Sequence, residues 1–250
     1  MTKTGYIGLR DSANEVNVGA IQPMGDLAEL AARIGMPPSI NRSGNVLYWT
    51  DFSHGIGEWT TDKQGATGTI LVSSGALHNR STCMTFRSEA GATKWTWAQH
   101  FMMLVSRGGM GFEFHAGSLL ATPRLEFGIY FYDGAHENQY VLRLDTSTGL
   151  LQRYDEDGAL QTVETDVRDL LVYLGELRVK LVVDLDNLVL HRLYLNNTQI
   201  SLVDLPCYPS ATSTAFYSYV FFKSLGVTGE ISGLSVSSVI VTQNEPLTPC

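Results

Sequence analysis

Two glutamates in predicted strands come closest to a pattern that could hydrolyse a glycan: Glu113, within the run GFEFH, and Glu126, within LEFG. Hydrolysis of a glycosidic bond uses two carboxyl groups on opposite sides of that bond. Neither strand supplies a second carboxylate two or four residues further on, and His115 and Gly128 stand two residues after the glutamates. We therefore interpret both glutamates as polar residues on a solvent-facing surface and predict no catalytic residue. The chain is predicted not to be an enzyme.

Four aromatic residues could instead form a stacking surface for sugar rings: Trp95, Trp97, Tyr130 and Tyr132. Alternate side chains of a strand share a face. Both tryptophans have the same parity as Phe101, which favours burial in a core. Tyr130 and Tyr132 lie on the side of Glu126, and we predict them as contact residues for a glycan or for a protein, because tyrosine is also enriched in protein interfaces.

No metal or cofactor site is predicted. The six histidines include no pair at a metal-binding spacing backed by a carboxylate. Cys83, Cys207 and Cys250 are too far apart for a metal knuckle and too few for a disulfide framework. The sequence also lacks a glycine-rich phosphate loop, a Gly-x-Ser-x-Gly elbow and a zinc-protease helix.

Composition limits the partners. The net charge of −8 argues against a nucleic-acid groove, which needs clustered lysines and arginines. No apolar run approaches bilayer length, and the first residues lack the apolar stretch of a signal peptide. We therefore expect synthesis in a cytoplasm, with no nucleic-acid or membrane partner.

The elements that must position these residues are strands. From Val46 onward, apolar and polar residues alternate with a period of two, most clearly over 177–185, where Arg178 and Lys180 oppose a row of aliphatic residues. This pattern predicts an antiparallel sheet with one packed face and one solvated face. Further strands are predicted near 66–73, 81–88, 94–105, 110–115, 188–195, 213–223 and 230–242. Residues 46–250 are thus predicted to form an all-β, antiparallel jelly-roll β-sandwich, in which 166–174 is either a helical turn or a connection.

Residues 1–45 lack this alternation and are predicted to form an N-terminal extended arm with one short helix. Asp26 is a good N-cap, Glu29 completes a capping box, and Gly35 ends the helix. A helix this short needs a surface to dock on, either the sandwich of the same chain or a neighbour. Its apolar stripe is the predicted interface: Leu27, Leu30, Ala31 and Ile34.

Three segments resemble the concanavalin A-like and laminin G-like jelly rolls of lectins, carbohydrate-binding modules and glycanase-like sandwiches. They are WTDFSHGIGEW (49–59), GELRVKLVVD (175–184) with LYLNN (193–197), and SSVIVTQNEP (237–246). The resemblance covers roughly residues 46–246. Many such relatives hold calcium between the opening aspartate and acidic residues of the closing strand, where this chain has Ser235, Ser237 and Ser238. We therefore predict that Asp51 hydrogen-bonds near the opening strand instead of binding calcium.

The arm, the acidic charge and the missing site pattern together favour a structural virion protein of a tailed bacteriophage. Its predicted role is capsid decoration, or cement, or a minor virion component, acting through protein–protein contacts with capsid subunits and with copies of itself as an oligomer. The alternative is a lectin-like carbohydrate-binding module for glycan attachment. A glycanase-like enzyme is the least favoured class.

Overall fold

The structure is a computed structural model that describes residues 44–73, 82–102, 108–118, 124–167, 176–212, 217–229 and 231–247. Leu27, Leu30, Ala31 and Ile34, with the predicted helix of the arm, lie outside the described residues. The segment 168–175, which includes most of the ambiguous stretch, also lies outside them. The division into an arm and a sandwich therefore stays a prediction.

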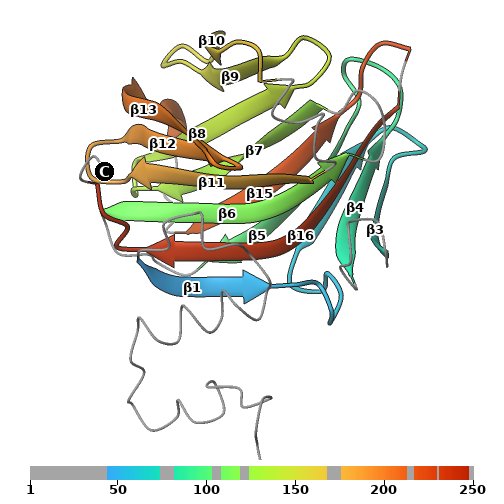
Figure 1. Ribbon diagram of the computed structural model, residues 1–250, viewed down its shortest axis with the longest axis horizontal. Helices are drawn as coiled ribbons and strands as arrows, with labels where there is room; N and C mark the ends of the chain where they lie inside the picture. Colours follow the sequence, from blue (N-terminus) through green and yellow to red (C-terminus); the bar gives the residue numbers. More distant parts are fainter. Residues whose placement is uncertain are drawn as a thin grey trace, which may run out of the picture.

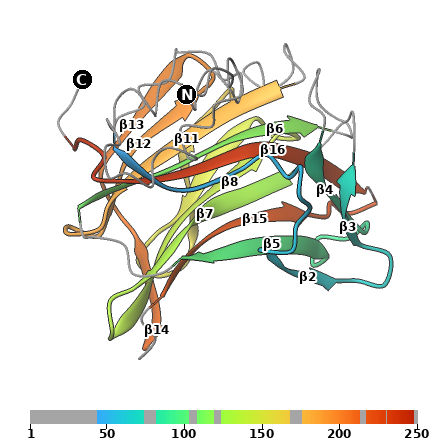
Figure 2. The same ribbon diagram turned by 90° about the horizontal axis from the view of Figure 1, so that it is seen from below.

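Two antiparallel sheets pack face to face, which confirms the predicted jelly-roll sandwich (Figure 1). The first sheet, sheet A, consists of β1 (Asn45–Thr50), β3 (Thr69–Ser73), β4 (Cys83–Ser88), β6 (Gly109–Ser118), β11 (Glu176–Asp184), β12 (Val189–Leu195), β13 (Thr198–Pro206) and β16 (Ser232–Gln243). Its order is β13-β12-β11-β6-β16-β4-β3, and β1 pairs with β16. Figure 2 shows β6 and β16 in one layer and strands of the second sheet in the other.

The second sheet, sheet B, consists of β2 (Thr60–Gln64), β5 (Trp95–Met102), β7 (Arg124–Tyr132), β8 (His136–Asp145), β9 (Leu150–Tyr154), β10 (Leu160–Glu164), β14 (Tyr208–Thr212) and β15 (Ser218–Leu225). Its order is β10-β9-β8-β7-β15-β5-β2. Strand β8 shares one edge between two partners, because β9 pairs with Leu142–Asp145 and β14 pairs with residues 136–139.

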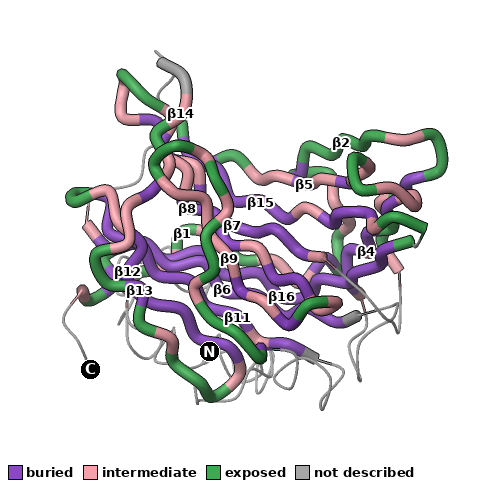
Figure 3. The backbone as a smooth tube through the Cα atoms, turned by 90° about the horizontal axis from the view of Figure 1, so that it is seen from above, coloured by how far each residue is buried: buried purple, intermediate pink, exposed green. Residues whose placement is uncertain are grey.

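Alternating side chains of the two sheets fill the space between them. On β7, Leu125, Phe127 and Ile129 are buried in this core, as their predicted parity requires. Phe222 of β15 is fully buried against a group of aromatic rings in the same core. Figure 3 shows burial concentrated on the central strands, whereas every residue of β2 is exposed.

The prediction that one face of the strand over 177–185 is solvated is wrong at Lys180. The Lys180 side chain is 1% exposed, and its Nζ lies 2.8 Å from Oε1 of Glu245, which is fully buried. Glu245 follows the last strand and fits closely over β6, where a Cβ on Gly109 would come within 2.1 Å of the Glu245 carbonyl oxygen. A residue 65 positions away thus supplies the counter-charge, which alternation along one strand does not reveal. Glu113, which was also expected to face solvent, is buried as well.

Asp51 hydrogen-bonds beside the opening strand, as predicted. Its Oδ1 accepts hydrogen bonds from the backbone N–H of Ser53 at 2.9 Å and from the Ser53 hydroxyl at 2.6 Å. Among the described residues, no three His, Cys, Asp or Glu side chains come together in a way that could hold a metal ion. The same part of the chain contains no helix with the length and apolar character needed to cross a membrane.

Candidate functional site

Sheet B carries a second cluster of aromatic side chains on the face that points away from the core. Successive residues of a strand point to opposite faces, so Phe221 lies in this outer cluster while Phe222 lies in the core. The outer cluster also contains Val141 and partly buried Tyr154. We define the aromatic face by its five central rings: Trp97, Tyr130, Tyr132, Tyr219 and Phe221.

Strand register brings these rings together from distant parts of the sequence. Tyr219 of β15 stands opposite Tyr130 of β7, and their rings stack at 4.6 Å with an interplanar angle of 12°. The rings of Trp97 and Phe221 lie 5.4 Å apart. Tyr130 and Tyr132 therefore lie together on the outer face, where their parity with Glu126 placed them.

The expectation that Trp95 and Trp97 belong to the core is wrong. Trp97 does share a side of β5 with Phe101, but that side is the aromatic face, and Phe101 is itself 44% exposed. The residues of β5 that face the core are smaller, such as the fully buried Ala98. Aromatic character alone therefore does not distinguish the two faces of a strand when both faces pack aromatic rings.

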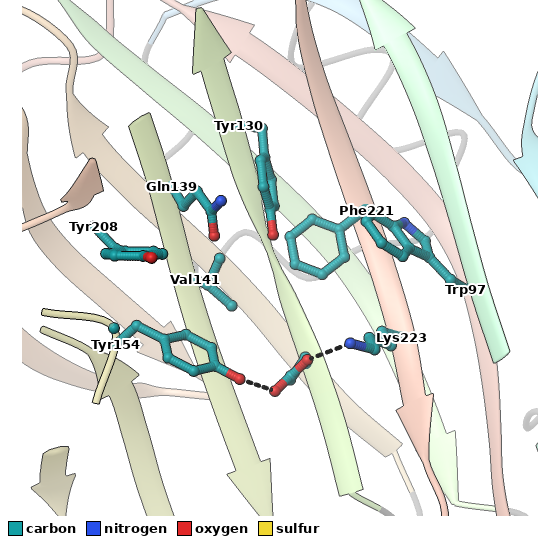
Figure 4. A pocket seen from close by; sticks show the side chains of 10 residues that line it. Trp97, Tyr130, Gln139, Val141, Tyr154, Tyr208, Phe221 and Lys223 are labelled. Carbon is teal, nitrogen blue, oxygen red and sulfur yellow. Dashed lines mark hydrogen bonds and ion pairs between the residues drawn. The ribbon is translucent and has the colours of Figure 1, made fainter. Parts of the chain in front are cut away.

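A pocket of about 140 Å³ opens within the aromatic face. Its walls are Trp97, Glu126, Tyr130, Gln139, Val141, Tyr154, Gly158, Tyr208, Phe221 and Lys223. Figure 4 shows Tyr154 and Tyr208 on one side, Trp97, Phe221 and Lys223 on the other, and Tyr130 with Gln139 between them. Gly158 brings the β9–β10 turn against the Tyr208 ring, because a Cβ at this position would lie only 3.1 Å from that ring. The β9–β10 hairpin and strand β14 thus form one wall.

Glu126 is the polar centre of the pocket. One of its carboxylate oxygens, Oε1, accepts hydrogen bonds from the Tyr154 hydroxyl at 2.7 Å, from Arg143 Nε at 2.8 Å and from Arg143 Nη2. The other oxygen, Oε2, lies 3.4 Å from Lys223 Nζ. Lys223 Nζ also lies over the ring of Trp97, 5.7 Å from its centroid. The carboxylate is buried and held by groups from three other strands, β8, β9 and β15.

The charged form of Glu126 is favoured at this position. Burial alone would raise the pKa of Glu126, but the nearby charges of Lys223 and Arg143 and the hydrogen bond from Tyr154 outweigh it, so its pKa lies below the ordinary value. Burial raises the pKa of the Tyr154 hydroxyl well above its usual range, and the adjacent Glu126 carboxylate adds to this effect. The pocket wall therefore contains an ionised carboxylate beside Lys223 and the neutral phenol of Tyr154, with Arg143 next to them.

This arrangement predicts a pH-dependent contribution to stability. A carboxylate whose pKa is lowered by folding stabilises the protein fully above its unfolded pKa, and this contribution disappears as pH falls through the folded value. We expect Glu126→Gln to be less stable than the wild type at pH 7, and we expect the difference to shrink toward pH 3. Urea unfolding across this range measures it, with the exposed Glu164→Gln as control. A constant difference from pH 7 to pH 3 would contradict the assignment.

The sequence analysis missed four charged or phenolic side chains: Arg143 beside the pocket, and Tyr154, Tyr208 and Lys223 in its wall. Each lies on a different strand, respectively β8, β9, β14 and β15. Their side chains meet Glu126 or its neighbours only through the register of the sheet, in which Glu126 stands opposite both Arg143 and Lys223. One sequence signal was available: Lys223 stands two residues after Phe221 on the same strand, so both side chains lie on the outer face.

No protein-family model matches the sequence, and no curated protein matches it. Among solved structures, the chain is similar to an endo-β-1,4-glucuronan lyase from the fungus Trichoderma reesei, with 9% identity, a TM-score of 0.52, and coverage of 79% of this chain and 95% of the other. It is also similar to a carbohydrate esterase from the Shiga toxin-encoding bacteriophage phi24B, with 11% identity, a TM-score of 0.50, and coverage of 81% and 100%.

The enzymatically active domain of tailspike protein 4 of bacteriophage CBA120 is a further match, at 13% identity and a TM-score of 0.38. The match covers 75% of this chain but only 20% of the solved domain, and this TM-score carries no argument. Carbohydrate-binding modules also occur among the matches. At these identities the likeness shows the fold alone, which is a jelly-roll sandwich found in carbohydrate-related proteins and in phage proteins.

The prediction that the chain is not an enzyme is corrected by this comparison. Structures with the same fold include a lyase and an esterase, so the fold is compatible with glycan-active enzymes. The prediction considered only pairs of carboxylates within one strand. Fold and function are separable, and chemistry on a sandwich depends on side chains that several strands bring together.

Proposed function

We propose that the chain binds glycans at the aromatic face of sheet B. The observation that supports this most directly is the pocket in which aromatic rings surround one fixed group of polar side chains. Binding sites for small ligands are typically concave and mostly apolar, with a few polar groups that fix orientation. This proposal takes up the lectin-like alternative in place of a purely structural role.

The chemistry of the pocket matches the two kinds of surface on a sugar ring. The C–H groups of a sugar carry partial positive charge and pack well against the negative face of an aromatic ring. Its hydroxyl groups need hydrogen-bond partners, which Gln139, Glu126 and Lys223 offer at the same place. Gln139 is held in position because its Nε2 donates a hydrogen bond to Glu137 at 2.6 Å.

Replacing Trp97 by alanine tests the proposal. Loss of an aromatic residue at the centre of a binding site typically costs about 1–2 kcal/mol, or roughly tenfold in affinity. A panel of immobilised neutral and acidic oligosaccharides first identifies a bound glycan, and titration then compares the wild type with Trp97→Ala. We expect about tenfold weaker binding by the variant.

Trp49→Ala is the matched control, because Trp49 is 39% exposed on β1 of the other sheet. This variant should bind like the wild type. If the panel yields no bound glycan, or if Trp49→Ala weakens binding as much as Trp97→Ala does, the aromatic face is not the binding site.

We also propose that the chain binds glycans as a component of a virus particle. The supporting likeness is the phage carbohydrate esterase, which has the same fold. Contacts with capsid subunits, oligomerisation and location in a virion were predicted from the organisation of the sequence and remain predictions. Imaging of purified particles with an antibody against this chain would test the location.

A further inference from the structure

We propose that the pocket takes a glycan that carries a carboxylate, such as a polymer of uronic acids, with the carboxylate placed at Lys223. This inference rests on the proposed glycan binding and names its ligand class. Two cations contact one carboxylate, Glu126: Lys223, which lines the pocket, and Arg143, which lies beside it, so the three groups together carry one unit of positive charge. The charge is notable in a chain whose net charge is −8.

The hydrogen-bonding capacity of these two cations is incompletely used. Within the described residues, Lys223 Nζ makes an ion pair at 3.4 Å and lies over the rings of Trp95 and Trp97, but it donates no hydrogen bond of normal geometry. Arg143 donates through Nε and Nη2, and its Nη1 donates to no described residue. An ammonium group has three donors and a guanidinium has five. Lys223 in the pocket wall and the adjacent Arg143 thus have more charged donors than they use on described residues.

The β9–β10 turn at the rim carries three acidic residues, of which Asp155 accepts hydrogen bonds within the hairpin while Glu156 and Asp157 are exposed to solvent. The other charges on this side of sheet B are engaged elsewhere or exposed. Arg124 and Asp145 form their own ion pair at 2.7 Å. Glu137 is engaged by Gln139, Tyr132 and Ser210 at the far end of the aromatic face. Asp62 stands opposite Trp97 on the edge strand β2, beyond the indole from Lys223, and is exposed to solvent. Among the described residues, Glu126 is the carboxylate that pairs with both cations.

Partial burial makes this charge effective. The side chains of Lys223 and Arg143 are 23% and 20% exposed, so an incoming anion meets them in surroundings less polar than water. The lowered pKa of Glu126 is consistent with a positive local potential, since the two cations overcome the effect of burial on that carboxyl group. A ligand carboxylate would accept charge-assisted hydrogen bonds, which are stronger than those of a hydroxyl group.

The experiment compares three polysaccharides on the full chain: polygalacturonate, the same polymer with its carboxylates methyl-esterified, and dextran sulfate. The first two share one backbone and differ in charge, and the third is a polyanion without carboxylates. Affinity electrophoresis in native gels measures the dissociation constant of each for the wild type, for Lys223→Met and for Lys63→Met. Lys63 is an exposed lysine of β2 and serves as the matched control.

We expect polygalacturonate to bind at least about tenfold more tightly than its methyl ester, which corresponds to the loss of one charge-assisted hydrogen bond. Lys223→Met should reduce this preference to less than about threefold, because it weakens binding of the acid more than binding of the methyl ester, while Lys63→Met should behave like the wild type. Melting curves of each variant confirm that it is folded.

Equal affinity for the acid and the ester would overturn the inference and leave glycan binding intact. A preference for the acid that survives in Lys223→Met would overturn it as well. Dextran sulfate that binds as tightly as polygalacturonate would overturn the assignment of a carboxylate. If none of the three polymers binds and the wider panel is also negative, both the inference and the proposed function fail.

Discussion

Replacing Phe222 by alanine is expected to lower the free energy of unfolding by about 3–5 kcal/mol, the usual range for removing a buried phenylalanine. Phe222 is fully buried between the two sheets. Its ring centroid lies 4.7 Å from that of Phe114 and 5.1 Å from that of Phe112 in sheet A, and 5.6 Å from that of Trp59. Because so many rings surround it, the space left by the ring cannot close without moving strands of both sheets.

Urea unfolding measures this loss, and Phe101→Ala provides the comparison. Phe101 is 44% exposed at the edge of the aromatic face, so its truncation should cost well under half as much. A Phe222→Ala variant with nearly wild-type stability would mean that the aromatic core is not packed as described.

Glu245→Gln is expected to cost about 3 kcal/mol or more, because breaking a buried ion pair leaves a buried cation with less compensation. Glu245 Oε1 lies 2.8 Å from Lys180 Nζ and accepts a hydrogen bond from Thr242 Oγ1 at 2.5 Å. Its Oε2 lies 4.0 Å from Arg192 Nη2. The side chains of Lys180 and Arg192 are 1% and 3% exposed, so water cannot replace the lost carboxylate charge.

Thermal and urea unfolding of Glu245→Gln and of the exposed Glu164→Gln test this expectation. For a chain of this size, a change of 1 kcal/mol shifts the midpoint of thermal unfolding by about 2–4 °C, so the first variant should melt roughly 6–12 °C lower. The double variant Lys180→Met/Glu245→Gln should recover part of the loss, since a neutral side chain replaces the buried cation. No recovery would point to Arg192 as the main partner of Glu245.

Alternation along the chain predicted most of the sandwich. The predicted segments 81–88, 188–195 and 230–242 correspond within a few residues to β4, β12 and β16. These strands pack their apolar residues against the core, although β12 and β16 are buried along nearly their whole length. Strand β2 was missed because all five of its residues are exposed, which removes that signal. Strand β14 was missed because it is short and contains a proline.

Side-chain environment was harder to predict than side-chain direction. The parity of Tyr130 with Glu126 was correct, yet Glu126 is buried instead of solvated. The reason lies outside β7: Lys223, Arg143 and Tyr154 reach the carboxylate from other strands. Likewise, Lys180 is buried because Glu245 arrives from the end of the chain. Contacts between residues so far apart in the sequence depend on the tertiary structure, so the sequence of a single strand does not predict them.

The floor and the rim of the pocket come from different parts of sheet B, because two separate segments share one edge of β8. The floor comes from β5, β7 and β15, strands that are paired on both sides in sheet B. The rim around Tyr154, Gly158 and Tyr208 comes from the β9–β10 hairpin and from β14. Each of these segments pairs with only about half of β8. Substitutions in these two peripheral segments can therefore change the width or the charge of the pocket entrance without disturbing the fold of the sandwich. Homologues with new ligand preferences should differ first in residues 155–159 and 208–210, and engineering of selectivity can begin there.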